Sequence, residues 1–197
     1  MPTATTYDDL LARVRGLVPA TGRIPVVGIS GHGGAGKSTV GLRLAADLGL
    51  REAQVVATDW CKAATCGRDA GMWEQHDWAL VESVVHDARR GRERLRFDYR
   101  WSSGETGVVD EPMPAVLLVE GIRLFSDRTR DWFDLAVWID LDPATAGARA
   151  KVRNAAQGDG RDDLDLWDTK WIPEGHAYER VERPAERADV VIAAAGP

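Results

Sequence analysis

Residues 31 to 38 combine glycines, a lysine and a serine in a spacing that is suited to binding phosphate. They read Gly31-His32-Gly33-Gly34-Ala35-Gly36-Lys37-Ser38, a complete G-x-x-x-x-G-K-S pattern. The glycines let backbone N–H groups turn toward phosphate oxygens, and the start of a following helix adds a favourable partial charge. An apolar run precedes the pattern and helically spaced apolar residues follow it. This strand–loop–helix context predicts a nucleoside triphosphate site rather than a glycine-rich turn without a ligand.

Each residue of this loop has an expected role. The residues expected to bind ATP are Gly33, Gly34, Ala35, Gly36, Lys37, Ser38 and Thr39. Lys37 is expected to reach the β- and γ-phosphates and so to act in catalysis. The Ser38 hydroxyl is expected to ligate Mg²⁺, so ATP and Mg²⁺ are the cofactors that the pattern predicts.

Two acidic residues follow predicted strands near this loop. Asp59 comes after the short apolar run Gln54–Ala57, and Glu120 ends the run Pro114–Val119. Phosphoryl transfer needs a base for the acceptor hydroxyl and an acid near the metal, and we expect Asp59 and Glu120 to fill these two roles. The alternatives are a turn aspartate at the strand end for Asp59 and a structural salt bridge for Glu120.

Three arginines follow the fourth predicted strand. Arg149 and Arg153 are four residues apart and share one face of a predicted helix, and Arg161 follows in a polar segment. We expect them to stabilise the transferring phosphoryl group from a small lid at about residues 149–172. The alternative is a solvated basic helix face that also includes Lys151.

Aromatic residues are frequent in the middle of the chain, which has eight tryptophans in all. Planar rings can stack on a base or a sugar, although core packing explains any single one of them equally well. The residues expected to contact the acceptor are Trp60, His76, Trp78, Tyr99 and Trp101.

These side chains need a scaffold, and the apolar runs predict one. Five predicted strands alternate with helical segments: Pro25–Ile29, Gln54–Ala57, Pro114–Val119, Leu135–Ile139 and Asp189–Ile192. Such alternation predicts an α/β fold, a P-loop NTPase three-layer sandwich with a five-stranded, mainly parallel sheet and helices on both faces. A further turn at Ser102–Gly107 is expected to join two short strands within residues 95–110. We expect residues 1–197 to form a single P-loop kinase domain.

Composition limits the partners that we expect. The chain has 197 residues and a formal charge of −6, from 25 basic and 31 acidic side chains, which argues against nucleic-acid binding. It has neither a long apolar run nor the features of a signal peptide, so we expect a cytoplasmic protein without membrane association. Cys61 and Cys66 are expected to be reduced thiols. The expected partner is a small-molecule acceptor, and the sequence is also compatible with a homo-oligomer.

The order and spacing of these features resemble the uridine kinase family, whose relatives include phosphoribulokinase-like and pantothenate kinases. The resemblance extends over about Val26 to Ile192. The matching elements are Asp59-Trp60, His76, Phe97-Asp98-Tyr99, Glu120-Gly121-Ile122, an F-D-x-x-x-x-x-D-x-D pattern from Phe133 to Asp142, Arg149, Arg153 and Glu182–Asp189. It implies that Asp59 is the catalytic base and that His76 contacts a nucleoside.

The sequence departs from the family mainly around the acceptor and the lid. Ala146 stands where the family usually has an arginine, Asn154 replaces an aspartate, and residues 76–80 keep only part of an H-P-D-A-F-D stretch. We therefore expect an ATP-dependent kinase that phosphorylates a hydroxyl of a nucleoside or a related metabolite. A kinase for a non-nucleoside hydroxylated metabolite, a nucleoside monophosphate kinase and a regulatory nucleotide-binding module are the alternatives.

Overall fold

A six-stranded parallel sheet forms the centre of the fold in the computed structural model, which describes residues 3–17, 23–101 and 103–194. Its strand order is β1-β8-β7-β2-β6-β3. The strands are β1 (Thr3–Ala4), β2 (Val26–Gly31), β3 (Val55–Ala57), β6 (Leu117–Gly121), β7 (Leu135–Asp140) and β8 (Val190–Ala193). All five predicted strands are confirmed. The sequence did not predict β1, because two residues are too few to show a periodicity.

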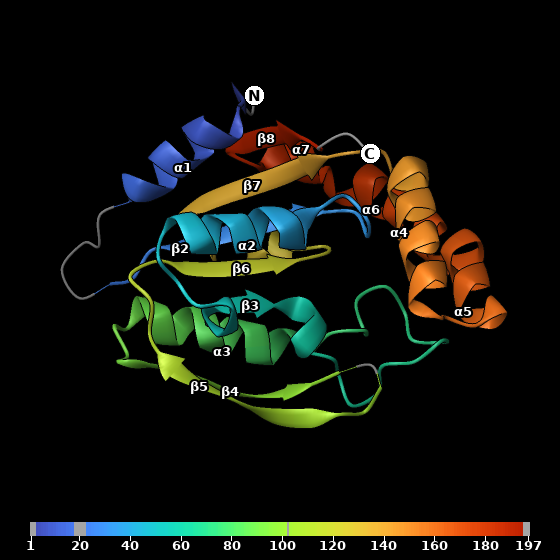
Figure 1. The fold of residues 1–197 in the computed structure, drawn as a ribbon, viewed down its shortest axis with the longest axis horizontal. Coiled ribbons are helices and arrows are strands. Elements are labelled where there is room, and N and C mark those ends of the chain that lie inside the picture. Colours follow the sequence, from blue (N-terminus) through green and yellow to red (C-terminus); the bar gives the residue numbers. More distant parts are fainter. Residues whose placement is uncertain (1–2, 18–22, 102, 195–197) are drawn as a thin grey trace.

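Helices cover both faces of this sheet, which confirms the predicted three-layer arrangement (Figure 1). They are α1 (Tyr7–Arg15), α2 (Lys37–Asp47), α3 (Trp78–Arg89), α4 (Pro143–Gln157), α5 (Arg161–Leu166), α6 (Ile172–Glu182) and α7 (Pro184–Arg187). Short 3-10 turns lie at Glu52–Gln54, Thr58–Trp60 and Asp127–Thr129, and a π-helical turn at Trp167–Trp171.

Alternating side chains of the strands build a separate apolar cluster on each face. In β2, Val27 and Ile29 join the cluster that also contains Leu10 of α1 and Leu44 of α2, whereas Val26 joins the cluster beneath α3. Fully burying a residue of this kind stabilises a fold by about 1.5–3 kcal/mol. Because both faces are covered, the strands read as continuous apolar runs in the sequence.

The register of three neighbouring strands decides which residues meet at their carboxyl ends. Ile29 of β2 and Ala57 of β3 both pair with Glu120 of β6. Asp59 therefore follows its strand near the level at which Glu120 and Gly121 complete β6 and the glycine-rich loop leaves β2. Ligands of open parallel sheets bind outside this edge.

A separate antiparallel hairpin lies beside α3 and consists of β4 (Arg94–Arg100) and β5 (Thr106–Pro112). It confirms the two short strands that the sequence predicted, although Ser102 of the predicted turn lies outside the described residues. Leu95, Phe97 and Val109 of the hairpin are buried in the cluster beneath α3. The hairpin thus extends the core beyond the main sheet.

The segment predicted to be a lid is largely helical. It comprises the second half of α4, α5 and the π-helical turn, and it stands beside the edge at which the strands end (Figure 1). Polar contacts join it to the loop that precedes α3: Arg68 pairs with Asp163 at 2.6 Å, and Lys170 donates to the Ala70 carbonyl at 2.7 Å. These contacts connect α5 and the π-helical turn to the loop between β3 and α3.

Candidate active site

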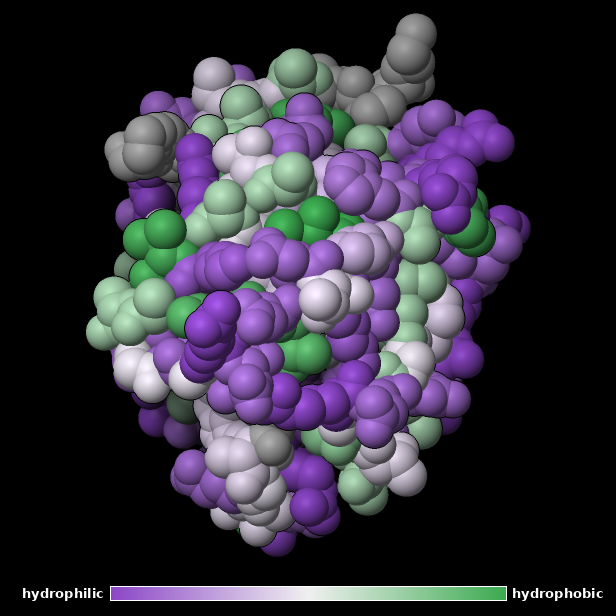
Figure 2. Space-filling view, turned by 90° about the vertical axis from the view of Figure 1, so that its right-hand side faces the viewer, coloured by the Kyte–Doolittle hydropathy of each residue, from purple (hydrophilic) through white to green (hydrophobic). Residues whose placement is uncertain are grey.

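A pocket of about 760 Å³ opens at the carboxyl ends of the strands. Small-molecule sites in proteins have volumes of about 300–1,000 Å³, so this pocket has the size of a ligand site. Figure 2 views the molecule from this side and shows a predominantly hydrophilic face. The pocket contains these residues of the expected site: Gly33, Gly34, Gly36, Lys37, Ser38, Thr39, Asp59, His76, Trp101, Glu120, Arg149 and Arg153.

The glycine-rich loop has the backbone conformation that only glycine adopts without strain. Gly34 and Gly36 have φ angles of 89° and 99°, and Lys37 begins α2 directly after them. The Lys37 ammonium donates to the His32 carbonyl at 3.0 Å, and the Ala35 amide donates to the same oxygen at 3.0 Å. Burial lowers the pKa of Lys37, and the charges of Glu120 and Asp59 oppose this shift.

A substitution at Gly34 tests whether the loop depends on close contact with α4. A Cβ there would lie 2.0 Å from the Ala146 carbonyl oxygen, whereas one at Gly36 would meet nothing within 4 Å. We expect Gly36→Ala to lose only the cost of a left-handed residue, about 1–2 kcal/mol of unfolding free energy. Gly34→Ala should lose a further ~1–3 kcal/mol, because α4 must move. Urea unfolding measures both, and equal losses would contradict the contact.

Ser38 and Glu120 lie together beside this loop. The Ser38 hydroxyl donates to the Glu120 carboxylate at 2.9 Å, and Glu120 is only 6% exposed. Burial raises the pKa of Glu120, and the Lys37 charge and the Ser38 hydrogen bond partly oppose this shift. No cluster of three or more His, Cys, Asp or Glu residues that could hold a metal occurs in the described part of the chain. One hydroxyl and one carboxylate still fit Mg²⁺, which typically takes few protein ligands and completes its shell with phosphate oxygens and water.

Asp59 lines the same pocket as the glycine-rich loop and forms an ion pair with a nearby lysine. The Lys62 ammonium contacts the Asp59 carboxylate at 2.7 Å and His76 Nε2 at 3.0 Å. His76 Nε2 is 3.8 Å from the Asp59 carboxylate, which is too far for a hydrogen bond. Lys62 is therefore the residue that contacts the carboxylate directly. The Asp59 side chain is 65% exposed to the open pocket, so burial opposes its ionisation only weakly, and the nearby His76 ring and Lys62 ammonium lower its pKa. The carboxylate is therefore ionised at neutral pH and can accept a proton.

The three predicted lid arginines do not share one position. Arg149 and Arg153 on α4 line the pocket, whereas Arg161 is exposed at the start of α5 and does not line it. The Arg153 guanidinium donates to the Asn154 side-chain oxygen at 2.9 and 3.1 Å. The structure thus brings two of the three arginines into the lining of the pocket.

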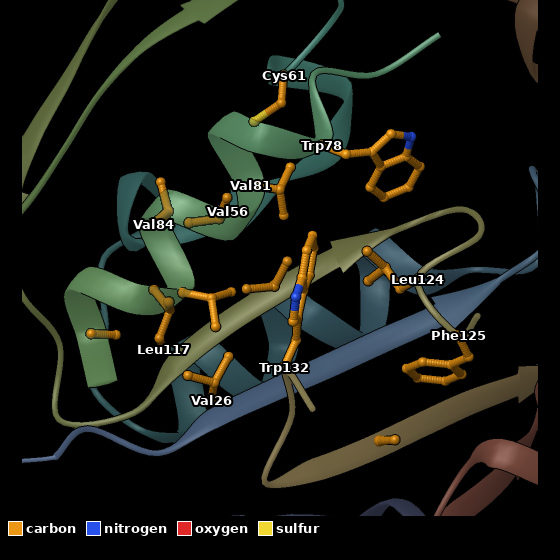
Figure 3. Close-up of a cluster of buried hydrophobic side chains, with 14 of the residues drawn as sticks. Val26, Val56, Cys61, Trp78, Val81, Val84, Leu117, Leu124, Phe125 and Trp132 are labelled. Atoms are coloured by element: carbon orange, nitrogen blue, oxygen red, sulfur yellow. The ribbon is translucent and has the colours of Figure 1, made fainter. Parts of the chain in front are cut away.

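The aromatic residues are distributed over three environments. His76 and Trp101 line the main pocket, and Trp101 also borders a second pocket of about 430 Å³ with Trp60 and Tyr99. Trp78 lies in the hydrophobic core beneath the sheet and is 6% exposed (Figure 3). Its ring N–H donates to the Trp73 carbonyl at 2.8 Å. The structure therefore places Trp78 in packing contacts and outside the lining of the pocket.

Sequence reasoning missed several polar residues that line the pocket, among them Lys62, Gln75 and Arg123. Lys62 lies three residues after Asp59, and this spacing was the available signal for an ion pair. Arg123 has a φ angle of 63°, donates to the Met72 carbonyl at 2.6 Å and pairs with Glu174. Nothing in the sequence near Arg123 indicates this conformation. Gln75 is buried and donates to two carbonyls of its own loop.

No helix in the described ranges is both long and apolar enough to cross a lipid bilayer.

No protein-family model and no curated protein sequence matches the chain. Solved structures do match it. A proposed fructose transport system kinase from Silicibacter sp. TM1040 is 21% identical with a TM-score of 0.74, and the match covers 95% of this chain and 99% of that one. A proposed uridine kinase from Bacillus stearothermophilus is 19% identical with a TM-score of 0.63, covering 94% and 96%. D-glycerate 3-kinase from Cryptococcus neoformans var. grubii serotype A is 13% identical with a TM-score of 0.63, covering 95% and 92%.

Identities this low show the fold and not the substrate. The chain therefore has the α/β fold shared by these P-loop small-molecule kinases.

Proposed function

We propose that this protein is an ATP-dependent kinase that transfers the γ-phosphoryl group of MgATP to a hydroxyl of a small molecule. One observation carries the proposal. The glycine-rich loop and Asp59 follow two parallel strands, Glu120 lies near the end of the strand between them, and all three line one pocket. Phosphoryl transfer depends mainly on positioning and charge neutralisation, and this arrangement supplies both.

The residues divide the reaction between them. The loop and Lys37 would hold the triphosphate, and Ser38 and Glu120 would hold Mg²⁺, which supplies charge neutralisation at the phosphates when it is bound. Asp59 would take the proton of the acceptor hydroxyl as the new O–P bond forms and the bond to the ADP leaving oxygen breaks. Arg149 and Arg153 line the same pocket and would stabilise the negative charge of the transferring group.

The sequence favoured a nucleoside as the acceptor, but this identity has less support than the phosphoryl-transfer reaction itself. Of the five residues expected to contact it, only His76 and Trp101 line the main pocket. Trp60 and Tyr99 face the second pocket, across Trp101. We therefore keep the acceptor in the proposal as a small hydroxylated metabolite, and the nucleoside as one candidate among such compounds.

ADP release with MgATP across nucleosides, nucleotides and hydroxylated metabolites tests the proposal. Turnover that depends on an acceptor is the expected result. If ATP binds and is hydrolysed at a rate that no acceptor raises, a regulatory nucleotide-binding module would be the better interpretation.

A further inference from the structure

The acceptor side of the pocket holds two cationic side chains that the proposed chemistry does not use. Five cationic side chains line the whole pocket together with two carboxylates, Asp59 and Glu120, and a third carboxylate, Glu174, pairs with Arg123 without lining the pocket. Three of the cations, Lys37, Arg149 and Arg153, belong to the nucleotide side. The other two, Lys62 and Arg123, line the pocket beside the loop that precedes α3, where the acceptor would bind.

Lys62 is held in an unusual place for a lysine. Its side chain is 13% exposed, and its ammonium lies between the Asp59 carboxylate and the His76 ring. His76 is neutral at neutral pH, because burial lowers its pKa. Asp59 is therefore the only counter-charge that contacts Lys62 among the described residues. An ammonium carries three N–H donors, so one N–H remains to donate to a ligand.

The proposed reaction itself removes this counter-charge. When Asp59 accepts the proton of the acceptor hydroxyl, it becomes neutral, and Lys62 would then lie largely buried without an opposite charge. An uncompensated buried charge is costly. An anionic group on the acceptor would compensate Lys62 throughout the reaction, whereas a neutral acceptor would not.

Arg123 supports the same conclusion from another part of the pocket lining. It is 4% exposed and its guanidinium is oriented by the Met72 carbonyl and by Glu174. Glu174 does not line the pocket, so its carboxylate compensates Arg123 from behind. A guanidinium fixed in this way is well suited to a carboxylate or a phosphate.

We infer that the acceptor carries an anionic oxygen group, a carboxylate or a phosphate, near the hydroxyl that is phosphorylated, and that Lys62 binds this group with Arg123 nearby. The inference rests on the proposed function and narrows its substrate class.

Matched pairs of neutral and anionic compounds test the inference. Suitable probes are glycerol with glycerate and glycerol phosphate, ribose with ribonate and ribose phosphate, and uridine with uridine monophosphate. We expect ADP release with one of the anionic compounds and not with its neutral counterpart. Whether a carboxylate or a phosphate is used identifies the group. Faster turnover with the neutral members would overturn the inference and leave the proposed function intact.

Lys62→Met tests the residue. We expect it to raise the KM for the anionic acceptor roughly tenfold to a hundredfold, the loss associated with a charged hydrogen bond, and to leave the KM for ATP unchanged. Lys62→Arg should restore part of the affinity. Arg130→Met is a matched control, because it also removes the cation of an i,i+3 ion pair but lies outside the pocket. Equal effects of the two Met variants would contradict the assignment.

A binding measurement separates this inference from the proposed function. With MgADP saturating the phosphate loop, an anionic probe should raise the melting temperature of the natural protein but not that of Lys62→Met. Such stabilisation without any turnover would reject the kinase and retain the anion site. If no anionic probe stabilises the protein, the inference is wrong whatever the turnover shows.

Discussion

Asp59→Asn is expected to lower acceptor-dependent ADP release by about 10²- to 10⁴-fold, the usual contribution of a general base. The amide keeps the shape of the side chain but cannot take up the proton. The Asp59 carboxylate accepts a hydrogen bond from Lys62 and none from the described residues of the glycine-rich loop, so MgATP should bind as before. Initial rates and a nucleotide titration measure the two effects.

Two controls make this result specific. Asp69→Asn changes an exposed aspartate of the same loop that does not line the pocket, and it should be neutral. Asp59→Asn also leaves Lys62 without its carboxylate, so the melting temperature must show that the variant is folded. A folded Asp59→Asn variant with undiminished turnover would assign Asp59 to the turn instead of the chemistry.

The main sheet could be predicted because burial on both faces leaves a direct trace in the sequence. The runs around Val27, Leu118 and Val137 are apolar throughout, and each lies in a covered strand. Once the strands are parallel, their carboxyl ends coincide, so residues that follow them must gather. The proximity of Asp59 and Glu120 follows from this topology alone.

The environment of single side chains was harder to predict. Trp78 was expected at the acceptor, yet it begins the buried stripe of α3 that continues through Val81 and Val85. This helical spacing was visible in the sequence and could have assigned Trp78 to the core. Lys62 and Arg123 lie in loops without periodicity, where tertiary contacts alone decide the position of a side chain. Sequence patterns therefore predict strand-end residues better than the loop residues that complete the pocket.

Glu120→Gln is expected to weaken activation by Mg²⁺ about 10- to 100-fold, the range typical of residues that support a metal ligand. The Gln oxygen can still accept the Ser38 hydrogen bond, so the local structure should persist while the negative charge is lost. A Mg²⁺ titration of ADP release at saturating ATP measures this effect. Glu120→Asp, which keeps the charge, should retain more of the response. An unchanged titration in Glu120→Gln would mean that the carboxylate serves the fold and not the metal.

The same substitution should change how stability depends on pH. Burial raises the pKa of Glu120 above its ordinary value of 4.5, so the folded state retains this proton at pH values where the unfolded state has released it. The stability of the natural protein therefore falls as pH rises from about 4.5 through the folded pKa, by at most about 1.4 kcal/mol for each unit of the shift. Glu120→Gln lacks this loss, so its stability relative to the natural protein should increase with pH over that window.

Urea unfolding of both proteins at a series of pH values measures the difference, and a difference that stays constant or falls with pH would contradict the assigned shift. The effect of Lys37 has the same sign. Its lowered pKa makes the folded state release the Lys37 proton before the unfolded state does, so this contribution to stability rises as pH increases toward the ordinary lysine value of 10.5. A variant that weakens the response to Mg²⁺ while gaining stability with pH would show that the buried carboxylate is kept for its chemistry at a cost to the fold.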